Sequence, residues 1–232
     1  SADENVYLQA FGSVIPARKV VIKPRVSGPV IDHSEAVIVG GQVKKGQDLV
    51  RIDPKDYELA LVEKKYALEQ ARFEVDVESG QQVIAQSEWA KLQVSLNDSD
   101  VNRSLVLREP HLRRARALME RAENDIETAE LHLSRTVITA PFNSMVVSES
   151  IEIGQLLSPN SEICELVGTD EFWIQVTVPF SDLHWIDFPE NGQGGSKARI
   201  ILDLGEGNSA QWEGQVLRLL GDLDPLGRMA RL

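Results

Sequence analysis

About eighty residues in the middle of the chain are typical of two long helices. From Asp56 to about Leu92 no proline occurs, and most residues are strong helix formers. In the second half apolar residues recur at alternating steps of three and four, the pattern of a coiled-coil seam. The seam positions are Leu112, Ala115, Met119, Ala122, Ile126, Ala129 and Leu133. Residues 55–136 are therefore predicted to form an antiparallel helical hairpin, with arms of ~40 residues and ~60 Å.

Local signals predict where the hairpin starts and turns. Asp53 is suited to cap the first helix, with Pro54 at its first position. The turn between the arms is predicted in a run of residues that favour turns and caps, namely Asn97, Asp98, Ser99 and Asp100.

The first arm has a weaker apolar pattern than the second. We predict that its inward stripe consists of Leu59, Val62, Tyr66 and Phe73. When the chain is folded at its predicted turn, Gly80 and Pro110 lie at nearly the same height. Because both residues weaken helices, a kink or bulge is expected there.

Short β-rich segments flank the hairpin on both sides. Residues 18–54 and 137–167 contain β-branched runs separated by glycine and proline, as in short strands. The two segments also resemble each other, since Gly41-Gln42-Val43 aligns with Gly154-Gln155-Leu156. We interpret this similarity as an internal repeat whose halves must pair. The hairpin is then an insertion in one β unit.

The last part of the chain predicts a second β unit. Phe172, Ile174, Val176 and Val178 alternate with polar or exposed positions, as in a half-buried strand. Residues 168–232 are expected to form a small antiparallel β-barrel, incomplete with three or four strands, and residues 1–17 a lead-in strand toward it. The predicted fold class is α+β, multidomain and elongated.

The composition and the scattered reactive residues argue against several functions. Lys and Arg number 24 against 36 Asp and Glu, a balance that disfavours nucleic-acid binding. The histidines, His33, His111, His132 and His184, are dispersed, and no hydrolase, zinc-protease or phosphate-loop motif occurs. No catalytic, metal or cofactor site is predicted, and the lone Cys164 is interpreted as a small strand residue. The sequence contains no run of ~18 apolar residues, the length needed to span a bilayer. Its first residues lack the features of a signal peptide, so any signal or anchor is expected to have been removed or to lie outside this chain.

The order of these parts resembles the HlyD-like membrane fusion proteins, the periplasmic adaptors of tripartite efflux pumps. The resemblance rests on four segments: residues 26–30, 41–49, 133–142 and 172–176. It implies that the split β unit is similar to a lipoyl or biotinyl carrier domain. A carrier needs an exposed lysine on the turn that the hairpin replaces, and the nearest lysine is Lys55 at a helix start. Cofactor carriage is therefore not expected.

The resemblance also implies partners and a location. The family's resistance-nodulation-division (RND) type links an inner-membrane transporter to an outer-membrane channel, through a ring of copies that encloses a conduit. By this resemblance the protein is periplasmic, held at the inner membrane by an N-terminal segment absent from this chain, and not an enzyme. The alternative is an adaptor of an ATP-driven type I secretion system, where a much longer hairpin is usual. A purely structural coiled-coil spacer is disfavoured by the flanking repeat.

The hairpin tip is the expected site of channel contact. The family often has Arg, then Leu four residues on, then Ser seven further; Arg103 and Leu107 fit, whereas Arg114 replaces the serine. We hypothesise that residues 95–107 contact the channel. The segment from residue 137 onward, with 14 acidic and five basic side chains, is expected to face the transporter. Without a Met-rich or His-rich segment, the predicted cargo is an organic small molecule.

Overall fold

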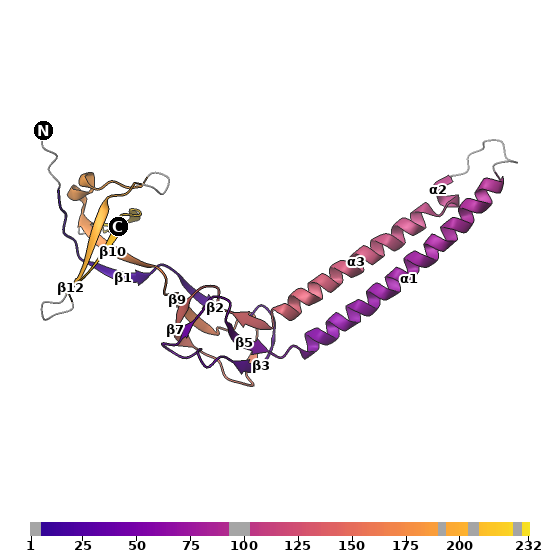
Figure 1. Cartoon of the computed structure of the whole chain (residues 1–232), viewed down its shortest axis with the longest axis horizontal. Helices are drawn as coiled ribbons and strands as arrows, with labels where there is room; N and C mark the ends of the chain where they lie inside the picture. The colour runs from indigo at the N-terminus through magenta and orange to yellow at the C-terminus, as the bar shows by residue number, and fades with distance from the viewer. Residues whose placement is uncertain (1–5, 93–102, 190–193, 204–208, 225–228) are drawn as a thin grey trace. The chain divides into compact units, whose positions relative to one another are not determined.

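The structure is a computed structural model that describes residues 6–92, 103–189, 194–203, 209–224 and 229–232 (Figure 1). The chain divides into two compact units. One unit is Val20–Val167, and the other combines Ser1–Lys19 with Gly168–Leu232.

The strands of the first unit form two four-stranded sheets, ordered β2-β9-β7-β4 and β6-β5-β3-β8. The strands before the hairpin are β2 (Lys19–Ile22), β3 (Gly28–His33), β4 (Gln42–Val43) and β5 (Asp48–Ile52). Those after it are β6 (Val137–Thr139), β7 (Ser144–Glu149), β8 (Leu156–Leu157) and β9 (Cys164–Gly168). Each sheet therefore takes two strands from each half, as the internal repeat predicted.

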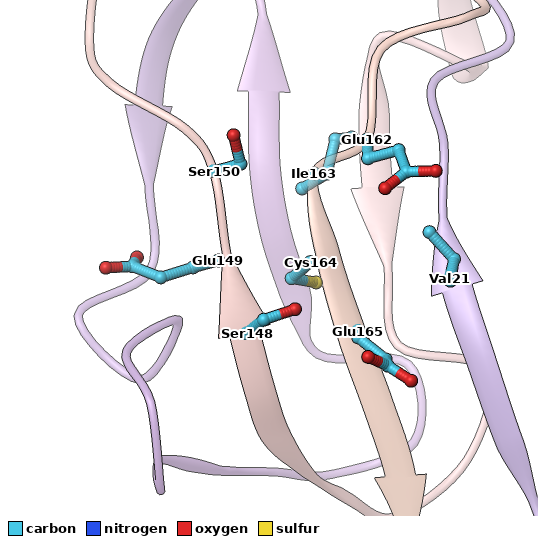
Figure 2. Close-up of a pocket in the computed structure, with 8 residues that line it drawn as sticks. All are labelled: Val21, Ser148, Glu149, Ser150, Glu162, Ile163, Cys164 and Glu165. Atoms are coloured by element: carbon cyan, nitrogen blue, oxygen red, sulfur yellow. The ribbon is translucent and has the colours of Figure 1, made fainter.

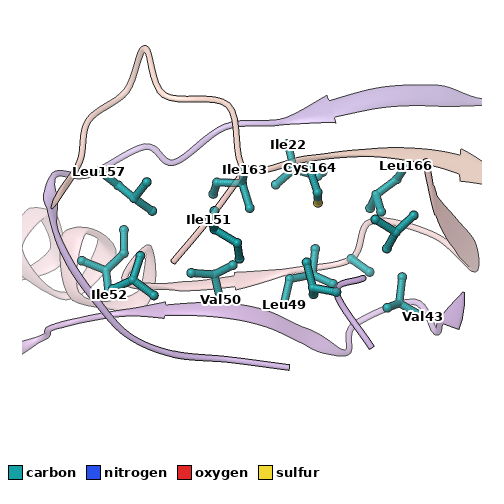
Figure 3. Packing of buried hydrophobic residues seen from close by; sticks show 14 of the residues in the cluster. Ile22, Val43, Leu49, Val50, Ile52, Ile151, Leu157, Ile163, Cys164 and Leu166 are labelled. Atoms are coloured by element: carbon teal, nitrogen blue, oxygen red, sulfur yellow. The ribbon is translucent and has the colours of Figure 1, made fainter. Parts of the chain in front are cut away.

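One hydrophobic core joins these two halves (Figure 3). Leu49 and Ile52 before the hairpin, and Leu157, Ile163 and Leu166 after it, are all 0% exposed. The burial follows the strand period, since β9 alternates buried and half-buried side chains. Both halves contribute fully buried side chains to this one core, so pairing across the insertion buries apolar surface of each half.

The hairpin consists of α1 (Lys55–Leu92), α2 (Arg103–Val106) and α3 (Glu109–Ser134). The backbone N–H of Lys55 donates to Oδ1 of Asp53 at 3.0 Å, so Asp53 caps α1 as expected. At its base the two arms are close, because Ile52 N–H donates to the carbonyl of Thr136 at 2.8 Å. Figure 1 shows α1 and α3 side by side, consistent with their contacts.

The irregularity expected near Pro110 is present in the second arm, whereas the first arm is one continuous helix. The second arm breaks between Val106 and Glu109, where Pro110 follows in the first turn of α3. A proline is tolerated in a first turn but not in a helix interior. By contrast, α1 continues through Gly80, because glycine lowers helix stability without removing a backbone donor.

The second unit contains an open sheet and a separate hairpin. Its sheet has the order β1-β10-β14-β13, from β1 (Gly12–Pro16), β10 (Phe172–Pro179), β14 (Met229–Arg231) and β13 (Leu220–Asp224). The hairpin pairs β11 (Lys197–Asp203) with β12 (Ser209–Gln215), and a 3-10 turn, η1 (Phe180–Trp185), follows β10. The N-terminal segment joins this unit, because Gly12 pairs with Val176. Among the strands that the structure describes, these sheets do not close into a barrel.

Candidate functional site

The seven seam positions predicted on α3 lie on one face of that helix. Four of them, Leu112, Ala115, Ala122 and Ala129, are buried. The other three, Met119, Ile126 and Leu133, are half-buried. With only two long helices in the hairpin, this burial comes from packing against α1. Alanine at three of the buried positions allows the two helices to approach closely.

The stripe predicted on α1 is wrong. Leu59, Val62, Tyr66 and Phe73 are 64%, 45%, 72% and 68% exposed. The side chains of α1 that are buried or half-buried instead recur at steps of three and four: Tyr57, Leu61, Lys64, Leu68, Ala71, Val75, Glu78, Gln82, Ala85 and Trp89. Because three members of this inner stripe are polar or charged, hydropathy alone does not reveal it.

The large exposed apolar residues of α1, apart from Val83, form a second stripe, which we call the outer stripe. At 100° per residue it lies nearly opposite the inner stripe. Its members are Leu59, Val62, Tyr66, Phe73, Val77 and Ile84. A helix with apolar residues on two opposite faces is typical of one that packs against two neighbours. The hairpin supplies only one of them.

Charged side chains border the outer stripe and cover the outer face of α3. Glu63, Lys65 and Glu74 of α1 are exposed, as are five charged residues on the outside of α3. Those α3 residues are Arg113, Arg114, Arg116, Glu120 and Glu123. The hairpin thus presents an apolar outer face on one arm and a strongly charged outer face on the other.

A partly buried ion pair joins the two arms near the helix break. Arg108 donates to Glu78 through Nε at 3.1 Å and through Nη2 at 2.9 and 2.8 Å. The two side chains are 33% and 14% exposed, less than those of the Lys23–Glu162, Arg51–Asp48 and Arg72–Glu69 pairs. Glu78 occupies an inner-stripe position, where a carboxylate is costly unless it is paired. Sequence reasoning missed this pair.

The residues predicted at the hairpin tip have different positions. Asn97, Asp98, Ser99 and Asp100 lie outside the described residues. Arg103, the first residue of α2, is exposed, whereas Leu107 is 7% exposed. Beside them on α2, Leu105 and Val106 are 54% and 37% exposed.

A small pocket lies over β7 and β9 in the first unit (Figure 2). Its lining includes Ser148, Glu149 and Ser150 from one side and Glu162, Cys164 and Glu165 from the other. The volume is about 70 Å³. Drug-sized ligands need several hundred Å³, so this pocket is too small to hold an exported compound.

We expect the Cys164 thiol to be unreactive in the folded protein. Burial first, and the negative charge of Glu149 second, raise its pKa from 9.0 to about 11. Since only the thiolate is nucleophilic, iodoacetamide at pH 8 should modify the folded protein at least ~100-fold more slowly than the guanidinium-unfolded protein. Mass spectrometry of timed samples measures both rates. Rapid modification of the folded protein would show that the residue is accessible.

Neither a metal-binding cluster nor a membrane-spanning helix is present among the described residues. No group of three or more His, Cys, Asp or Glu side chains there is arranged to hold a metal ion. No described helix combines the length and apolar character needed to cross a bilayer.

A β unit split by a long helical hairpin and followed by a second β unit is the architecture of membrane fusion proteins. A family model described as "RND MFP, barrel-sandwich hybrid domain" matches residues 18–167. The chain belongs to this RND membrane fusion protein family.

Curated relatives support the assignment. The chain is 27% identical over 183 residues to multidrug resistance protein MdtA of Yersinia pestis (strain Pestoides F), covering 76% of this chain and 38% of that protein. It is 26% identical over 190 residues to MdtA of Pectobacterium carotovorum, covering 80% and 44%. The chain therefore spans less than half the length of these relatives.

Solved structures share the fold. A putative efflux transporter from Bacteroides eggerthii is 23% identical with a TM-score of 0.64, and the match covers 96% of this chain and 60% of that one. A MacA-MexA chimera carrying the Pseudomonas aeruginosa MexA α-hairpin is 20% identical with a TM-score of 0.60, covering 95% and 70%.

Proposed function

We propose that the protein is a periplasmic adaptor that links an RND-type inner-membrane transporter to an outer-membrane channel. Several copies form a ring whose hairpins enclose a conduit for small molecules. The observation that carries this proposal is the outer stripe of α1, an apolar surface that a single hairpin leaves exposed. The family model is of the RND type, so an adaptor of an ATP-driven system is not favoured.

The parts of the chain have separate roles in this proposal. The unit made of 18–54 and 137–167 is lipoyl-like but carries no cofactor, and the hairpin of 55–136 replaces the carrier turn. Residues 168–232, with the lead-in strand of 1–17, form part of a β-barrel. A segment outside this chain anchors the protein at the inner membrane. The protein has no catalytic role of its own.

Rotational symmetry determines which residues of neighbouring hairpins meet. Glu78 faces Arg108, so residues on opposite arms lie at the same height when their numbers add up to about 186. A ring axis along the hairpins preserves that height from copy to copy. If the outer stripe packs against the outer face of α3 of the next copy, three oppositely charged pairs lie within two residues of equal height. These pairs are Glu63 with Arg121, Lys65 with Glu120, and Glu74 with Arg114. All six side chains are exposed. Opposite charges then attract across the interface once neighbouring hairpins shift by one or two residues, ~3 Å, from the register in which Glu63 faces Glu123.

The transporter contact is assigned to the acidic unit of 168–232. Trp185 and Trp212 are 56% and 52% exposed there, and exposed tryptophans are common at interface centres. In cells, photo-cross-linkers at these two positions should capture an RND transporter that co-purifies with the full-length, membrane-anchored protein. Capture of an ATP-driven transporter instead would favour the alternative adaptor class.

The channel contact is assigned to the exposed face of α2. Arg103, Leu105 and Val106 are open to a partner, while the buried Leu107 holds α2 to the hairpin. We expect Arg103→Glu to abolish most export of a fluorescent dye by the assembled pump, because charge reversal at a contact opposes binding. The matched control is Arg25→Glu, which reverses an exposed arginine on the β unit. Unchanged export with Arg103→Glu would remove α2 from the channel interface.

A further inference from the structure

Arg108 has an unusual backbone for a residue that is not glycine. Its φ of 55° and ψ of 19° lie in the left-handed region. In the described parts of the chain it is the only non-glycine residue with a positive φ. Side chains with a Cβ are disfavoured there, and glycine is the usual choice at such helix ends. An arginine at this position indicates that an interaction of its side chain compensates for the unfavourable backbone conformation.

Arg108 lies between α2 and α3 and is the N-cap residue of α3. Its N–H donates to the carbonyl of Leu105 at 3.0 Å, while its own carbonyl accepts from His111 and Leu112, both at 3.1 Å. Pro110 prevents α2 and α3 from joining into one helix, since its ring would clash with the carbonyl of Val106. Pro110 therefore requires a break, but it does not determine the direction in which α2 continues.

We propose that the Glu78–Arg108 pair is a positioning latch that fixes the direction of α2 relative to α1. The guanidinium fork engages both carboxylate oxygens, which restrains the orientation of Arg108 as well as its distance. Glu78 belongs to the continuous helix α1, so the latch ties the left-handed residue to a rigid element. The pair thereby determines the direction in which the exposed residues Arg103 and Leu105 of α2 face. Only this consequence for the channel contact rests on the proposed function.

Spin labels on the two arms test the latch without any partner. Labels replace the exposed Lys65 and Leu105, which are separated by roughly 24 Å along the hairpin axis, within the range of pulsed electron resonance. The labels are attached to cysteines introduced at these two positions. The native Cys164 is changed to alanine so that it cannot carry a third label. Glu78→Gln removes the ionic acceptor, and we expect the distance distribution to broaden by about one helical turn, ~5 Å.

Two further variants make the test decisive. Arg108→Gly removes the guanidinium but suits the left-handed backbone, so it folds and should broaden the distribution as much as Glu78→Gln does. Arg72→Gln is the matched control, because it breaks the exposed Arg72–Glu69 pair on the same hairpin and should leave the distribution narrow. A narrow distribution in either Glu78→Gln or Arg108→Gly, with helicity retained by circular dichroism, would overturn the latch. Failure of the adaptor proposal would appear in export and co-purification, not in these distances.

Discussion

Leu166→Ala is expected to accelerate amide hydrogen exchange in β5 by about 10² to 10³-fold. Leu166 lies after the hairpin in the sequence, whereas β5 lies before it. Leu166 is 0% exposed in the core that both halves share. Truncation of a buried leucine costs about 2–5 kcal/mol, and each ~1.4 kcal/mol is tenfold in an opening equilibrium. Because the two halves form one core, the loss should reach Val50 and Ile52. Exchange measured by mass spectrometry on peptides of residues 45–54 reports it.

A matched control tests whether the effect of Leu166→Ala comes from the loss of a buried side chain or from any leucine truncation after the hairpin. Leu156→Ala makes the same chemical change in β8 at a side chain that is 73% exposed, and should change exchange little. If Leu166→Ala accelerated exchange only in residues 137–167, the halves would be independently stable and the description of one shared core would be wrong.

The pairing of the two β segments was predictable because it depends on local patterns. Alternating apolar residues and turn glycines occur in both halves, and their similarity implies a common unit. The α3 stripe was predictable for a related reason, since its seam residues recur at alternating steps of three and four. The arrangement of the 168–232 segment was harder to predict, because strands such as Ser209–Gln215 are polar and mostly exposed.

The first arm could not be interpreted correctly from hydropathy. Its outer stripe includes the large residues Tyr66 and Phe73, while the inner stripe includes Lys64, Glu78 and Gln82. A method that assigns the most apolar face to the interior therefore chooses the wrong face. Glu78 belongs inside only because Arg108, thirty residues later, pairs with it. Such a contact has no local signal in the sequence.

Tyr66→Ser combined with Phe73→Ser is expected to weaken self-association of the full-length protein by about 10² to 10⁴-fold. The two side chains are 72% and 68% exposed in one copy. Burial of an aromatic side chain of this size contributes about 1.5–3 kcal/mol, and two such side chains account for the range. Analytical ultracentrifugation in detergent measures the association. The control Phe11→Ser removes an aromatic that is 86% exposed in the other unit, and should leave association unchanged.

Charge reversal identifies the partner of the outer stripe. In the register that pairs Glu63 with Arg121, either Glu63→Arg alone or Arg121→Glu alone places like charges opposite each other in neighbouring copies and should weaken association. Within one hairpin these residues lie on outward faces, so the double variant should restore association only if α1 of one copy meets α3 of the next. If the aromatic changes weaken association but the double reversal does not restore it, the stripe packs against a different surface. Full association of the aromatic variant would exclude the outer stripe from the ring.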